Sequence, residues 1–216
     1  MATSHSHSDG IARTAVVLAP LAFAALLMLH PTAGTSFYEM ITTDSATWMV
    51  VHLGSAALFP VMAWVVWHLL RDVPGRAATV ARVALPVFAV AYGVFEAMVG
   101  IAAGIVAREG EAASGAGQEA LAATVERIVT HPAVGELGAF NSVGAIAWIV
   151  AITGSIVALG ANGAARGSLV LLAIGALMVQ HVPPIGPAAL VCISAAAWLL
   201  ERAHARAARR LALQPA

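Results

Sequence analysis

Six stretches of the chain are apolar enough to form membrane-spanning helices. A helix needs about 20 mostly apolar residues to cross the hydrocarbon core of a bilayer. Four stretches reach this length, and the last two are shorter, at about 15 residues each. The predicted helices cover residues 11–30, 47–70, 83–107, 137–159, 168–182 and 186–200. The pattern predicts an all-α fold: a polytopic transmembrane bundle of about six helices, forming one domain over residues 11–201.

A proline-rich turn separates the two short helices. Pro183 and Pro184 follow the first of them, and Pro187 lies near the start of the second. Three arrangements fit this pattern: a tight hairpin, a thinned part of the membrane, or a broken helix that lines a cavity. We favour the hairpin, because proline lacks an N–H group and its ring blocks the preceding helical turn.

The two ends of the chain are more polar than the domain between them. Residues 1–10 predict a disordered tail, and residues 202–216 predict a basic cytoplasmic tail. The first apolar stretch is long enough to span the membrane, and no convincing small-residue cleavage site follows it. We therefore interpret it as a retained helix rather than a signal peptide.

The connection over residues 108–136 has two parts. Residues 109–117 are rich in glycine, alanine and serine and predict a flexible linker. The second part has apolar residues spaced as on one face of a helix, at Leu121, Val125, Ile128 and Val129. This predicts an amphipathic helix on the extracytoplasmic side, acting as a lid, lying in the membrane plane, or forming a plain surface helix.

The composition agrees with a membrane protein and excludes several other classes. Hydrophobic residues make up 60% of the chain and charged residues 10%, with a mean hydropathy of +0.87. Soluble domains carry about 25% charged residues, so a soluble enzyme or a disordered protein is excluded. The 11 basic residues are balanced by 11 acidic ones, which argues against binding to nucleic acid. The absence of lysine excludes a lysine Schiff base, and Cys192 alone cannot form an intrachain disulfide.

The arginines predict the orientation of the bundle in the cell membrane. With six helices, nine arginines fall on one side, and only Arg108 and Arg127 fall on the other. Cytoplasmic loops carry the excess of positive charge, so both termini of this multi-pass protein are predicted to be cytoplasmic. The nine are Arg13, Arg71, Arg76, Arg82, Arg166, Arg202, Arg206, Arg209 and Arg210.

Glu96 is a carboxyl group near the middle of the third predicted helix. A charge at this depth costs roughly 2.5–3.5 kcal/mol on insertion scales, so Glu96 is expected to face the bundle interior. Tyr92, Gly100 and Gly104 share its face, and the two glycines allow close helix packing, or oligomerisation through that face. Glu96 is interpreted as a proton site, a cation ligand, or the acceptor that orients a ligand histidine. The alternative is a protonated carboxyl that makes one interhelical hydrogen bond.

Four histidines lie at the extracytoplasmic ends of predicted helices. His30, His52, His131 and His181 come from four different segments at about one level. Neutral imidazole is a common metal ligand and the usual axial ligand of haem. The four histidines are therefore predicted to hold haem b or a transition metal. The alternative is that each simply reaches water at the membrane interface.

Asn141 lies about one turn inside the extracytoplasmic end of the fourth predicted helix, where it is expected to contact a ligand, to hold a histidine, or only to pack. Glu96 and His52 are predicted to face one interior cavity, with Tyr92 or Asn141 also on its wall. Counting from the predicted helix ends gives a depth difference of about 8 Å between Glu96 and His52. If the ends of the two helices lie at the same depth in the membrane, these two side chains are too far apart for a direct hydrogen bond.

Three functions are compatible with these residues. The first is a redox-related protein that binds haem b or a transition metal near the extracytoplasmic face. The second is a transporter of a small molecule, proton or cation that uses Glu96. The third is a membrane-embedded hydrolase with histidine-bound zinc and Glu96 or Glu136 as the general base. The expected partners are the lipid bilayer and a small-molecule or ion ligand, without nucleic acid.

Overall fold

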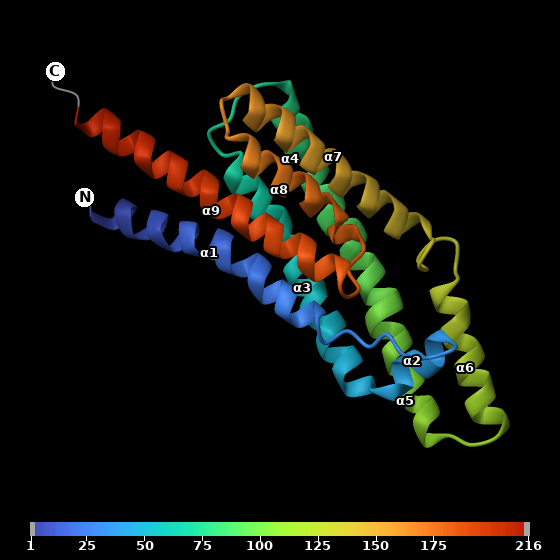
Figure 1. The fold of residues 1–216 in the computed structure, drawn as a ribbon. Coiled ribbons are helices and arrows are strands. Elements are labelled where there is room, and N and C mark those ends of the chain that lie inside the picture. Colours follow the sequence, from blue (N-terminus) through green and yellow to red (C-terminus); the bar gives the residue numbers. More distant parts are fainter. Residues whose placement is uncertain (1–2, 214–216) are drawn as a thin grey trace.

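The chain folds into a bundle of long helices that run up and down side by side (Figure 1). The computed structural model describes residues 3–213, and this part of the chain contains helices and turns but no strand. The helices are α1 (Thr3–Leu27), α2 (Phe37–Thr43), α3 (Ser45–Leu69), α4 (Arg76–Phe95), the π-helix η1 (Glu96–Ala102), α5 (Ala103–Ala112), α6 (Ala116–Val129), α7 (Ala139–Ala161), α8 (Arg166–Gly175), the 3-10 helix η2 (Ala176–Val179) and α9 (Ile185–Ala212).

Five helices within residues 3–213 are long and apolar enough to cross a membrane. They are Gly10–Leu27, Ser45–Leu69, Arg76–Ala112, Ala139–Ala161 and Ile185–Ala207. The predicted fold class, an all-α helical bundle, is thus confirmed. The predicted helix at residues 168–182 corresponds to α8 and η2, which are apolar but shorter, with 10 and 4 residues.

A tight turn at residues 180–184 joins η2 to α9, and α8 packs against α9 as in the favoured hairpin. Pro187 lies in the first turn of α9, where a missing N–H group interrupts no helical hydrogen bond. The sixth helix was predicted to end at residue 200, but α9 continues to Ala212. Alanine and arginine dominate residues 202–212, and both are strong helix formers, so the predicted tail continues the helix.

Helix α1 begins at Thr3, within the segment that was predicted to be disordered. No proline interrupts residues 3–10, so the segment can extend the apolar helix that follows it. Met1 and Ala2 of the predicted tail, and residues 214–216 of the basic tail, lie outside the described residues. Helices α1 and α9 lie along each other (Figure 1), and Ser194 donates a hydrogen bond to the Val17 carbonyl at 2.7 Å.

Helices α2, α5 and α6 gather at the end of the bundle away from both termini, here called the far end (Figure 1). The predicted amphipathic helix is present as α6, and its Val125 and Val129 are buried. Glu126 of α6 accepts a hydrogen bond from the Tyr38 backbone N–H of α2 at 3.1 Å. The predicted flexible linker is mostly helical instead, because α5 continues to Ala112 and the break before α6 is only three residues long.

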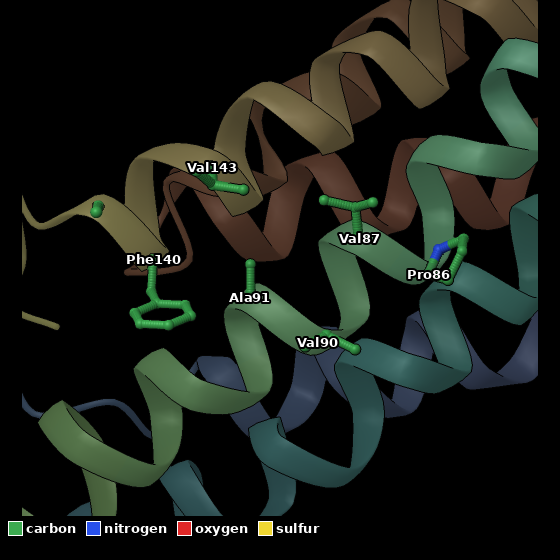
Figure 2. A pocket seen from close by; sticks show the side chains of 7 residues that line it. Pro86, Val87, Val90, Ala91, Phe140 and Val143 are labelled. Carbon is green, nitrogen blue, oxygen red and sulfur yellow. The ribbon is translucent and has the colours of Figure 1, made fainter. Parts of the chain in front are cut away.

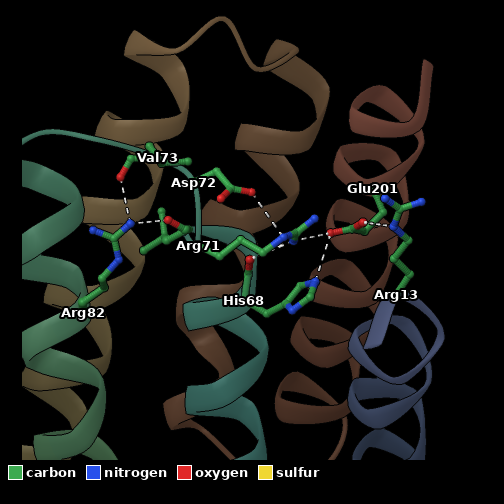
Figure 3. A network of polar contacts seen from close by, with 8 residues as sticks. Arg13, His68, Arg71, Asp72, Val73, Arg82 and Glu201 are labelled. Carbon is green, nitrogen blue, oxygen red and sulfur yellow. Dashed lines mark hydrogen bonds and ion pairs between the residues drawn. The ribbon is translucent and has the colours of Figure 1, made fainter. Parts of the chain in front are cut away.

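A buried carboxylate joins three helices at the opposite end of the bundle, where both termini lie (Figure 3). Glu201 of α9 accepts a hydrogen bond from Arg71 at 2.9 Å. His68 of α3 and Arg13 of α1 each lie 3.4 Å from the same carboxylate. Because its partners come from α1, from α3 and from the turn after α3, Glu201 holds these segments to α9.

Replacement of Glu201 by alanine is expected to lower the free energy of unfolding by about 1–2 kcal/mol, because it removes the buried carboxylate that Arg71, Arg13 and His68 share. The value is below the cost of breaking a fully buried pair, since Arg71 and Arg13 are partly exposed. Thermal unfolding in detergent measures the effect, with Glu119→Ala on the exposed surface of α6 as the matched control. Equal melting temperatures for the two variants would contradict the role given to Glu201.

Candidate functional site

Three of the four predicted histidines come together near the far end of the bundle. His30 follows α1, His52 lies in α3, and His181 lies in the turn after η2. Their ring centroids are 5.1 Å apart for His30 and His52, 5.6 Å for His30 and His181, and 6.5 Å for His52 and His181. All three are buried, with exposed fractions of 7%, 2% and 8% for His30, His52 and His181. We call these three residues the histidine cluster.

Glu96 contacts the histidine cluster directly. The distance between His52 Nδ1 and Glu96 Oε2 is 2.6 Å, and Glu96 is completely buried. Within the described residues, His52 Nε2 and Glu96 Oε1 have no hydrogen-bond partner. The prediction of an 8 Å depth difference was therefore wrong. The helix that carries Glu96 runs over Arg76–Ala112, 37 residues, so its end extends past the start of α3 and the two helix ends are not level.

A π-helical turn and a glycine bring Glu96 and His52 together. Glu96 is the first residue of η1, and π-turns within α-helices are frequent at functional sites. A side chain at Gly100 would collide with the His52 ring, so only glycine lets the two helices approach this closely. Trp48, one turn before His52, donates from Nε1 to the Gly100 carbonyl at 2.7 Å, and its ring lies 4.1 Å from the His52 ring.

The predicted oligomer face is used within the chain. A Cβ at Gly104 would lie 2.6 Å from Met49 Sδ and 3.0 Å from the Trp48 ring. Gly100 and Gly104 thus pack against α3 of the same molecule. A second copy of the chain has no access to this face while α3 covers it.

Each ring of the histidine cluster has one nitrogen engaged by an acceptor. His30 Nδ1 donates to the Pro31 carbonyl at 2.7 Å, and His52 Nδ1 donates to Glu96. The Val179 carbonyl accepts a hydrogen bond from the His181 ring. Histidines that bind metals are held in this way, by a carboxylate or backbone carbonyl on the second ring nitrogen. The arrangement leaves one nitrogen of each imidazole for another ligand.

Burial keeps the histidines of the connecting segments neutral. Removal from water and, to a smaller extent, the neighbouring His52 together lower the pKa of His30 to about 4. Burial likewise lowers the pKa of His181 to about 4. Both imidazoles are therefore unprotonated at neutral pH, which is the form that binds metals.

A cavity of about 430 Å³ adjoins the histidine cluster. Asn141 lines it and donates a hydrogen bond from its amide to the Glu136 carbonyl, whereas Glu96 and His52, which were predicted to face one cavity, are not among its lining residues. Burial and the nearby Glu96 carboxylate raise the pKa of Glu136. The lining residues are His30, Pro31, Thr32, Phe37, Met40, Trp48, Glu136, Leu137, Asn141, Val179, Gln180, His181 and Val182.

Two predicted site residues lie elsewhere. His131 is exposed in the connection between α6 and α7, where its Nδ1 accepts a hydrogen bond from the Ala133 backbone at 3.2 Å. The structure does not bring it to the other three histidines. Tyr92 is buried against Phe59 and Phe95 rather than on the cavity wall, and its hydroxyl lies 3.4 Å from the Val179 carbonyl.

A larger hollow between α4 and α7 is not a candidate for this site (Figure 2). Its volume is about 590 Å³, and every lining side chain is apolar. Side chains with this character suit contact with lipid. The lining residues are Pro86, Val87, Val90, Ala91, Ala139, Phe140 and Val143.

Sequence reasoning did not place Trp48 in the site, and it named Glu136 only as one of two general bases for the hydrolase hypothesis. Trp48 precedes His52 by four residues, a spacing that puts both on one helix face, and this signal was present in the sequence. Glu136 lies in an irregular connection, where no periodicity shows the direction of a side chain.

Comparison of the chain with protein-family models, curated proteins and solved structures finds no match. Among the residues that the structure describes, no three His, Cys, Asp or Glu side chains are arranged, as they stand, to hold a metal ion. The function of the chain is therefore inferred from the chemistry of the histidine cluster and its surroundings.

Proposed function

We propose that the chain is an integral membrane protein that binds one divalent transition-metal ion through His30, His52 and His181. The observation that carries this proposal is the set of three buried imidazoles, each with one nitrogen engaged by an acceptor and the other left for a ligand. Three neutral histidines with an open fourth position form a known type of transition-metal site.

The ring spacing is near that of such a site. With metal–nitrogen distances of about 2.0–2.1 Å, three imidazoles placed tetrahedrally around one ion have centroids about 5 Å apart. Two of the three separations are 5.1 and 5.6 Å, and the third is 6.5 Å. A movement of the His181 ring by about 1 Å toward His52 would bring the third separation close to the value expected for three imidazoles that bind one tetrahedral ion. The fourth position would then face the cavity.

A metal ion fits this cluster better than haem b. Haem with two axial histidines needs the rings on opposite faces of a wide flat macrocycle. Here the His30 ring contacts both other rings edge to face, and Trp48 packs on His52. Among divalent ions, imidazole sites favour Cu²⁺ and Zn²⁺ by the general affinity order. Copper would give the site the redox role expected from the sequence.

We place the histidine cluster on the extracytoplasmic side of the cell membrane. Both termini lie at one end of the bundle (Figure 1), together with Arg13, Arg71 and Arg82 (Figure 3). The excess of arginine at that end supports a cytoplasmic location for it. The far end, with the cavity and α6, then faces the other side.

Metal binding tests the proposal. Metal-free full-length protein in detergent is expected to bind one Cu²⁺ or Zn²⁺ per chain, measured by calorimetric titration and elemental analysis. His52→Ala and His181→Ala are each expected to lose at least 100-fold in affinity, because two imidazoles hold an ion far less well than three. His131→Ala is the matched control and should bind like the wild type, since His131 is exposed and apart.

Two results would overturn the proposal. One is wild-type protein that melts cooperatively in detergent but binds neither ion. The other is binding that survives in the His52→Ala, His181→Ala double variant and disappears in His131→Ala. A Soret band in the purified protein would instead favour the haem prediction.

A further inference from the structure

The cavity beside the histidine cluster reaches from the buried site to the surface. Two of its lining residues, His30 and His181, are at least nine-tenths buried. Another, Leu137, is 97% exposed. A space lined by both kinds of residue connects the imidazole nitrogens with the outside of the protein at the far end.

The polar lining of this cavity favours cations. Among the residues that line it, Glu136 is the one acidic side chain, and none is arginine. Within the described part of the chain its carboxylate takes part in no ion pair, so no protein cation offsets it. Glu96 adds a second buried carboxyl close enough to influence Glu136. A cleft lined by charge of one sign concentrates counter-ions and speeds their binding by about 10- to 1,000-fold.

From this arrangement we infer that the cavity is the route by which the metal ion reaches the histidine cluster, and that Glu136 is the first carboxylate that the ion meets. The inference rests on the proposed metal site. The ion passes from Glu136 to the three imidazoles, because Cu²⁺ and Zn²⁺ prefer nitrogen ligands to a single carboxylate. Asn141 holds the Glu136 backbone by its amide hydrogen bond and so fixes the residue at the cavity wall.

The kinetics of Cu²⁺ binding to metal-free full-length protein test this route. Cu²⁺ quenches tryptophan fluorescence, and Trp48 lies beside His52, so binding can be followed by stopped flow. Glu136→Gln is expected to slow association at least 10-fold at low ionic strength, and the wild-type rate should fall as salt is added. Glu136→Asp keeps the charge and should stay within about three-fold of the wild-type rate. Glu119→Gln removes an exposed acid of α6 outside the cavity and serves as the control.

The outcomes separate this inference from the proposed function. Support requires that Glu136→Gln still binds one ion per chain at equilibrium but binds it slowly. If the wild type binds Cu²⁺ and Glu136→Gln binds it as fast, the route is wrong and the metal site stands. If Glu136→Gln loses the ion although Glu136→Asp retains it, Glu136 is a permanent ligand and not a step on the route. If the wild type binds no ion, both ideas fall.

Discussion

Replacement of Glu96 by glutamine is expected to weaken metal binding by about 10- to 100-fold while the helices stay folded. Glu96 accepts the Nδ1 proton of His52 at 2.6 Å, which fixes the ring orientation and makes Nε2 the free, more basic nitrogen. Glutamine keeps the size and one acceptor oxygen but lacks the charge. Competition titration with a chelator measures the affinity, with Glu119→Gln as a charge-matched control on the exposed face of α6.

Glu96→Leu distinguishes a positioning role from a tolerated buried acid. Leucine removes the unpartnered Glu96 Oε1, but it also removes the acceptor of the buried His52 Nδ1 proton, so stability and metal binding are measured on the same sample. A positioning role predicts that the folded Glu96→Leu variant binds the metal poorly. Full wild-type affinity in Glu96→Leu would show that the acid does not serve the site.

Replacement of Gly100 by alanine is expected to destabilise the fold by about 1–3 kcal/mol and to reduce metal affinity together with it. The added methyl group would overlap the buried His52 ring, which is held between Trp48 and Glu96 and cannot move away freely. Thermal unfolding in detergent and metal titration of the same sample measure both effects.

Gly93→Ala is the matched control for this prediction. Gly93 lies in α4, seven residues before Gly100, and a Cβ built there meets no atom within 4 Å. Because alanine is the better helix former, this variant should be as stable as the wild type or slightly more stable. If Gly100→Ala melted at the temperature of Gly93→Ala and bound metal fully, the close packing of η1 on His52 would have no energetic importance.

Hydropathy was enough to predict the position of each long helix and the inward direction of Glu96. The sequence also predicted that His30, His52 and His181 lie at a similar depth along the bundle, since they occupy corresponding ends of helices. The same reasoning placed His131 at that level, yet it is exposed, because level says nothing about direction in an irregular connection. The direct contact between His52 and Glu96 depends on helix ends that are not level, and hydropathy windows do not reveal such offsets.

The π-helical turn η1 lets two residues of one helix, Glu96 and Gly104, face the same neighbouring helix. Glu96 has to meet His52, and Gly104, two turns later, has to meet Met49 and Trp48 on the same helix α3. Successive residues of an α-helix are rotated by about 100° around its axis. Removal of one residue from residues 97–99 would therefore turn either Glu96 or Gly104 away from α3. After a single-residue deletion there, Glu96 and Gly104 would no longer both face α3, although the composition and hydropathy of the chain would hardly change. The extra residue in this turn is a specific part of the design of the site.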